Sequence, residues 1–206
     1  MSHKLLLVHP TLRYSMSKEL HRKIRELTEC FPAEARFFLF SDTSYQSYAG
    51  ELRRENGRRS DTGEIKDKSF LQEILDSDAI TIAGHIGGNC HHTAYEAVVA
   101  TAWREKRKLS ITLQTDAISD AIDHDRYSMR DRIQHLSRRE PELPGRLSWI
   151  QPADRSPLET AALITMQLYL RQVQRFRMQV LVDKKPVYTP TSFSGINVAI
   201  DTASIQ

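Results

Sequence analysis

Cys90 lies close to three histidines, His85, His91 and His92, in the segment HIGGNCHH. A thiolate is a nucleophile, imidazole is a general base, and both ligate metals. A zinc site needs three or four well-spaced ligands, usually including a second ligand pair elsewhere, and the sequence offers no such pair, so we predict no metal. Cys90 also lies at the N-terminus of a predicted helix, where a thiolate is favoured, and is a candidate nucleophile. The alternative is that Cys90 is only a small residue that packs in a tight loop.

The glycine-rich segment before Cys90 predicts a ligand-binding loop. Ala79–Ala83 (AITIA) is apolar without alternation, as expected for a strand buried on both faces of a sheet. Gly84, Gly87 and Gly88 follow it and let the backbone approach a flat or anionic group. A small-residue helix then begins near His92, and its unpaired amides would point at the same place.

Strand-like and helix-period segments alternate along the chain, which predicts a parallel sheet covered on both faces. The expected strands are Lys4–Val8, Arg36–Phe40, Ala79–Ala83, Leu109–Leu113 and Leu147–Ile150. The expected helices are Met16–Glu29, Phe70–Leu75, His92–Glu105 and a last one from Pro157 to Phe176. This pattern is typical of a doubly wound, five-stranded, flavodoxin-like sheet with strand order 2-1-3-4-5.

The alternation ends near residue 176, which predicts a flavodoxin-like α/β domain over residues 1–176 and a strand or hairpin extension over residues 177–206. In that extension VLVDKKPVY has the pattern of a hairpin and INVAI that of a strand. A five-stranded core does not require them, so we expect the extension to cover a sheet edge or join a second copy. Residues 41–69 are polar and charged and predict a long surface excursion.

The first predicted loop has the composition of a phosphate site. Thr11, Ser15 and Ser17 supply hydroxyls, and His9 or Arg13 could add charge. The helix that begins near Met16 supplies free amides and a positive dipole end. The alternative is that Ser15 or Ser17 only caps this helix.

Two blocks of the sequence resemble a known family. In LLLVHPTLRYSMSKEL a first strand ends in His9-Pro10, four residues pass, and Ser15 begins the helix. LDSDAITIAG is similar to the third-strand pattern L-x-x-A-D-x-I-V, and GHIGGNC is similar to a flavin-ring loop. Together these motifs resemble flavodoxin-like NAD(P)H:quinone oxidoreductases and NADPH-dependent FMN reductases.

The resemblance implies a flavin enzyme. FMN or FAD would take hydride from NAD(P)H and reduce a quinone-like or flavin acceptor, with the flavin doing the redox chemistry. His85 is the candidate catalytic residue, to protonate or orient the acceptor, and the family implies a homodimer. The residues expected to contact the cofactor are His9, Thr11, Arg13, Ser15, Met16, Ser17, Gly84, His85, Ile86, Gly87, Gly88, Asn89, Cys90 and Thr115.

Departures from the family pattern keep two other functions open. Lys18 stands where the family has Asn, no aromatic pair follows Gly84, and LQTDAISDA has no glycine pair. These changes favour a flavodoxin-like binding or regulatory module without flavin. The segment CHHTAYEA is also similar to the cysteine segment of isochorismatase-like hydrolases, although its Thr-Ala spacing differs and His9 stands in place of their aspartate base.

Composition also narrows the possible partners of the protein and its expected location in the cell. A formal net charge of +3 from 29 basic and 26 acidic residues does not indicate a nucleic-acid partner. Two cysteines do not make a disulfide framework, so we expect a reducing cytoplasm. The apolar run Leu5–Val8 is too short for a signal peptide or a membrane span, which predicts no membrane insertion.

Overall fold

The chain forms one mixed sheet of eight strands in the order β3-β2-β1-β4-β5-β8-β6-β7. The computed structural model describes residues 2–10, 18–41, 56–85, 89–120, 127–139 and 168–201. All neighbouring strands run parallel except β7, which is antiparallel to β6. The strands are β1 His3–Val8, β2 Arg36–Phe40, β3 Asn56–Arg59, β4 Ala79–Gly84, β5 Leu109–Ile118, β6 Gln179–Val182, β7 Lys185–Tyr188 and β8 Ile196–Asp201.

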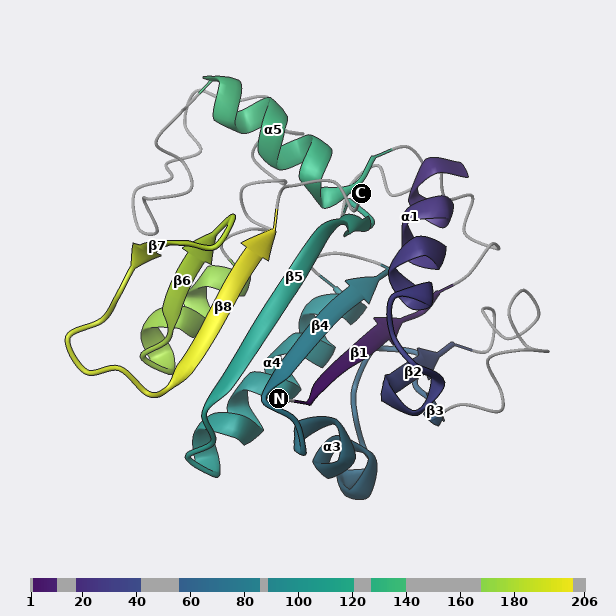
Figure 1. Cartoon of the computed structure of the whole chain (residues 1–206), viewed down its shortest axis with the longest axis horizontal. Helices are drawn as coiled ribbons and strands as arrows, with labels where there is room; N and C mark the ends of the chain where they lie inside the picture. Colours follow the sequence, from purple (N-terminus) through teal and green to yellow (C-terminus); the bar gives the residue numbers. More distant parts are fainter. Residues whose placement is uncertain are drawn as a thin grey trace.

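Helices cover both faces of this sheet. α1 connects β1 to β2, and α4 connects β4 to β5 in the opposite direction along the sheet. Because such crossovers are right-handed, the two helices lie on opposite faces, as Figure 1 shows. The labelled helices are α1 Lys18–Glu29, the short 3₁₀ helix η1 Ala33–Ala35, α3 Lys68–Leu75, α4 Cys90–Arg104 and α5 Met129–Arg139, and residues 168–175 are also helical.

The predicted α/β class and parallel sheet are confirmed, and the first four expected strands have the expected order, as β2-β1-β4-β5. The prediction of five strands is wrong, because the sheet has eight. β8 takes the place beside β5 that we expected for Leu147–Ile150, and that segment lies outside the described residues. Side chains alternate between buried and half-buried along β8, so this short strand fits the interior of the sheet.

The tail differs from a simple edge extension. β6 and β7 form the expected hairpin, and its turn residues Asp183 and Lys184 both have positive φ, as type I′ turns require. β8 lies between β5 and β6 and pairs with both. The sheet is therefore continuous across residue 176.

The predicted excursion contains regular structure where it is described. β3 adds a strand beside β2, and the chain then leads into α3. Asp67 caps that helix by accepting hydrogen bonds from the backbone amides of Ser69 and Phe70, and bonds to Ser69 and Arg58 lower the pKa of its carboxyl. Residues 42–55 lie outside the described part of the chain.

Buried aromatic and histidine side chains join α4 to the helix at 168–175. His91 is fully buried, its Nδ1 lies 2.8 Å from the Tyr169 hydroxyl, and the Tyr95 hydroxyl donates to the Tyr169 carbonyl at 3.3 Å. Burial lowers the pKa of His91 to about 3, so the imidazole is neutral at neutral pH. The contact is thus one hydrogen bond between neutral groups inside the core.

Tyr169→Phe is expected to reduce the free energy of unfolding by about 1–3 kcal/mol, because it leaves His91 Nδ1 buried without this partner. Urea denaturation followed by circular dichroism measures the loss. Tyr188→Phe, on half-buried β7, is the matched control and should change stability by less than about 0.5 kcal/mol. Equal losses for the two variants would contradict a specific role for the His91 bond.

Candidate functional site

The side of the sheet on which the chain adds its next strand changes between β1 and β4. The connection from β1 leads to β2 on one side, whereas β4 and β5 extend on the other. In open parallel sheets, ligands bind in the crevice outside the carboxyl ends of the strands at such a switch point. Val8 and Gly84 are paired as the last residues of the two strands, so His9 and His85 follow side by side. The structure therefore places His9, Gly84 and His85 together at this edge of the sheet.

His9 connects the switch point to the chain that follows β3. Its backbone amide donates to the Leu39 carbonyl at 2.8 Å, and its Nε2 lies 2.5 Å from the Ser60 carbonyl. A carbonyl only accepts, so Nε2 carries the proton and Nδ1 is the acceptor. Burial lowers the pKa of His9, opposed by the bond to Ser60 and the charge of Asp61. His9 therefore supplies a neutral imidazole here and not a positive charge.

Gly84 has a structural role at this edge. Its φ is +115°, and a Cβ at this position would lie 2.1 Å from the Val8 carbonyl oxygen. The Gly84 carbonyl accepts from the Ser119 amide at 3.0 Å, and the His85 amide donates to the Val8 carbonyl at 2.7 Å. Glycine is therefore required for β1, β4 and the end of β5 to approach one another.

Cys90 is the first residue of α4 and is largely buried. Its Sγ lies 3.8 Å from the Asp61 carbonyl oxygen, and burial raises the pKa of the thiol. Asn89 occupies the N-cap position but makes no side-chain cap hydrogen bond. The thiol form is therefore favoured, whereas a nucleophile requires the thiolate.

The turn Ser60–Gly63 is a part of this site that sequence reasoning missed. Ser60 contacts His9, Asp61 contacts Cys90, and a Cβ on Gly63 would lie 1.9 Å from the Cys90 carbonyl oxygen. Gly63 has a φ of +79°, so glycine permits both the turn and the close approach. The dipeptide Thr62-Gly63 in a polar run was the available turn signal, but it does not indicate which element the turn contacts.

The carboxyl end of β5 holds buried polar residues that we did not predict, except Thr115. The Thr115 hydroxyl donates to the Asp201 carbonyl at 2.5 Å, so it holds β8 beside β5. Asp116 accepts from Gln114 Nε2 at 2.9 Å and lies 3.8 Å from Lys23 Nζ on α1. The polar run QTDAISD was the sequence signal, although alone it indicates a loop as readily as a strand.

The expected site residues that lie outside the described residues are Thr11, Arg13, Ser15, Met16, Ser17, Ile86, Gly87 and Gly88. Within the described ranges, no group of three or more His, Cys, Asp or Glu side chains could hold a metal ion. In the same ranges, no helix is long and apolar enough to cross a membrane.

Comparisons with known proteins add little to this geometry. No protein-family model matches the chain, and no curated protein matches it. Among solved structures, the chain is similar to a putative Mar1 ribonuclease from Leishmania major, with 10% sequence identity and a TM-score of 0.41. The match covers 85% of this chain and 90% of that one. A TM-score at this level does not establish a shared fold or a shared activity.

Proposed function

We propose that this protein is a flavodoxin-like oxidoreductase that binds FMN or FAD at the crevice outside β1 and β4. NAD(P)H would be its electron donor and a quinone-like or flavin molecule its acceptor. The observation that carries the proposal is the strand order β2-β1-β4-β5, which makes β1 and β4 the switch point. The sequence motifs that resemble the reductase family include residues at this point, His9 in the first block and Gly84-His85 in the second.

The described residues near the crevice are chemically compatible with a flavin phosphate and ring. The ring of oxidised flavin is uncharged, and His9 is a neutral imidazole because burial lowers its pKa. The two buried carboxylates at the end of β5 face cations: Asp116 lies near Lys23, and Asp120 accepts from Arg132 Nε at 2.9 Å. These pairs reduce the repulsion that a phosphate would meet. The phosphate would bind the hydroxyls of Thr11, Ser15 and Ser17.

The bound flavin would supply the redox chemistry by accepting hydride and passing electrons on. His9 holds the Ser60–Gly63 turn against the crevice through Nε2, which positions the turn beside α4. His85 directly follows β4 at this crevice, the position from which it would orient the acceptor, and its side chain is fully buried within the chain itself. None of these roles requires the Cys90 thiol.

Flavin titration tests the proposal. We expect the purified protein to be yellow, or to bind added FMN with a shift in the flavin absorbance bands. Ser15→Ala should weaken FMN binding by about 1–3 kcal/mol, because a charged acceptor loses a donor. Riboflavin, which has no phosphate, should bind both forms equally and serves as the control. A colourless protein that binds neither FMN nor FAD would overturn the oxidoreductase.

A binding or regulatory module without flavin is the second candidate. The observation that favours it is that two expected cofactor contacts are engaged within the chain: His9 with the Ser60 carbonyl, and Thr115 with the Asp201 carbonyl. Both side chains are almost fully buried. Failure to bind flavin by a folded protein would support this module.

A further inference from the structure

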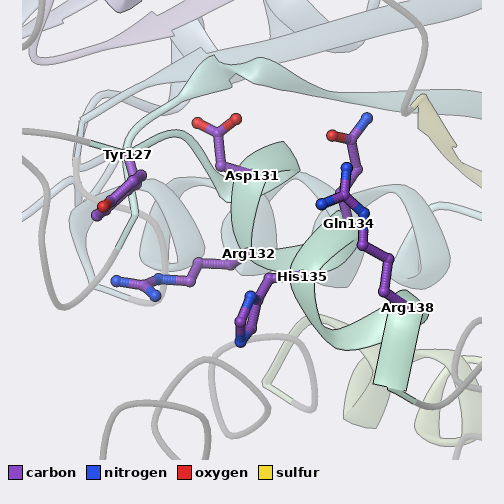
Figure 2. Close-up of a pocket in the computed structure, with 6 residues that line it drawn as sticks. All are labelled: Tyr127, Asp131, Arg132, Gln134, His135 and Arg138. Carbon is purple, nitrogen blue, oxygen red and sulfur yellow. The ribbon is translucent and has the colours of Figure 1, made fainter.

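A polar hollow lies beside α5, and Arg132 in its lining is bonded to Asp120, just past the carboxyl end of β5. Its volume is about 360 Å³, within the range of small-molecule sites and small for a macromolecular partner. Figure 2 shows the side chains that line it, which come from α5 and from Tyr127, two residues before the helix begins. They are Tyr127, Asp131, Arg132, Gln134, His135 and Arg138.

Arg132 is held in place on one side of its guanidinium. Its Nε donates to Asp120 at 2.9 Å, and the guanidinium carbon lies 4.7 Å from the centre of the Tyr127 ring. Its Nη2 is buried and has no hydrogen-bond partner within the described part of the chain. The hollow thus contains a fixed cation with an unpaired Nη2, whose N–H groups a ligand oxygen could accept from.

Arg138 adds a second cation at the hollow. Its side chain is exposed, and in the residues that the structure describes no hydrogen bond or ion pair engages it. The α5 sequence MRDRIQHLSRR contains four arginines and one aspartate. That aspartate, Asp131, already accepts from the Ser128 amide at 2.8 Å and the Ser128 hydroxyl at 2.7 Å as a helix cap. The lining itself contains two arginines, Arg132 and Arg138, and one aspartate, so it carries a net positive charge.

We propose that this hollow binds the phosphate groups of a small anionic molecule. A planar guanidinium matches two phosphate oxygens at once, and a pair of arginines at one hollow favours phosphate over a monocarboxylate. The exposed part of the Tyr127 ring gives an organic phosphate a flat surface beside the cations. This site does not depend on the flavin proposed at β1/β4.

Calorimetric titration with inorganic pyrophosphate tests the site directly. We expect saturable binding that Arg138→Gln weakens about tenfold, the effect of one charge-assisted hydrogen bond. Arg25→Gln removes an equally exposed arginine from α1 and is the matched control, which should bind as the unmodified protein does. Because no residue in the described part of the chain pairs with Arg138, its replacement should leave the unfolding temperature unchanged.

Further ligands identify the source of the phosphate. Tighter binding of ADP or NADP⁺ than of pyrophosphate would indicate a nucleotide, and equal binding would indicate recognition of the phosphates alone; both outcomes support the site. Absence of pyrophosphate binding, or equal weakening by Arg138→Gln and Arg25→Gln, would overturn it in favour of diffuse attraction to a basic chain. Much tighter binding of a single-stranded RNA that Arg138→Gln does not weaken would also overturn it.

Discussion

Deletion of residues 180–206 is expected to leave a chain that does not fold. The deletion removes β8, whose residues Ile196, Val198 and Ile200 are almost fully buried, together with its neighbour β6 and the outer strand β7. It also exposes the unpaired backbone of β5 along the register Leu109–Gln114. Expression in soluble form and far-UV circular dichroism are the measurements, and we expect an aggregated or unfolded product.

Two point variants test whether the stability of the protein depends on β8 in particular or on any change in residues 180–206. Ile196→Ala should reduce the free energy of unfolding by about 2–5 kcal/mol, because it leaves a cavity in the core. Lys185→Ala, on the exposed side of the hairpin, should change it by less than about 0.5 kcal/mol. A truncated chain that stays soluble and unfolds cooperatively would show that the sheet does not depend on β8.

Gly84→Ala should destabilise the protein by about 3 kcal/mol or more. The new Cβ would lie 2.1 Å from the Val8 carbonyl oxygen, at a φ of +115° that L side chains rarely adopt. β1 and β4 would have to separate at the switch point, so any ligand binding at this crevice should be lost with the stability. Thermal unfolding and urea titration measure the effect.

Gly195→Ala is the matched control for this substitution. Gly195 also has a positive φ, of +91°, but the nearest atom to an added Cβ is the flexible Lys108 side chain at 3.1 Å. Only the backbone strain remains there, so we expect a loss of about 1–2 kcal/mol. Similar losses at Gly84 and Gly195 would show that strain alone, and not the contact between β1 and β4, makes glycine necessary at residue 84.

Sequence reasoning succeeded where the signal was local. β1, β2, β4 and β5 contain buried apolar runs, and their predicted order in the sheet is the order observed. The same reasoning placed Leu147–Ile150, and not Ile196–Asp201, beside β5. Both segments are short and apolar, and the choice between them depends on pairing between distant parts of the chain, which periodicity does not encode.

The contacts of the site that the sequence did not predict also join residues that are far apart in the chain. The contact of Ser60 with His9 and that of Asp120 with Arg132 join polar residues from separate loops and helices. In the sequence, each of these residues lies in a polar segment that is typical of an exposed loop or of the solvent-facing side of a helix. Only the folded sheet shows that Asp120 is almost fully buried and requires a cation.

The position of β8 has a consequence for how the protein is made. Leu109 of β5 pairs with Ile196, so a ribosome completes β5 long before it releases the strand that will cover this edge. At about 5–20 residues per second, the nascent chain carries an open parallel edge for several seconds. Parallel pairing between such distant segments is slow to form, and open strand edges bind one another. Chaperone capture of the growing chain, more than the stability of the finished sheet, should therefore limit the yield of folded protein.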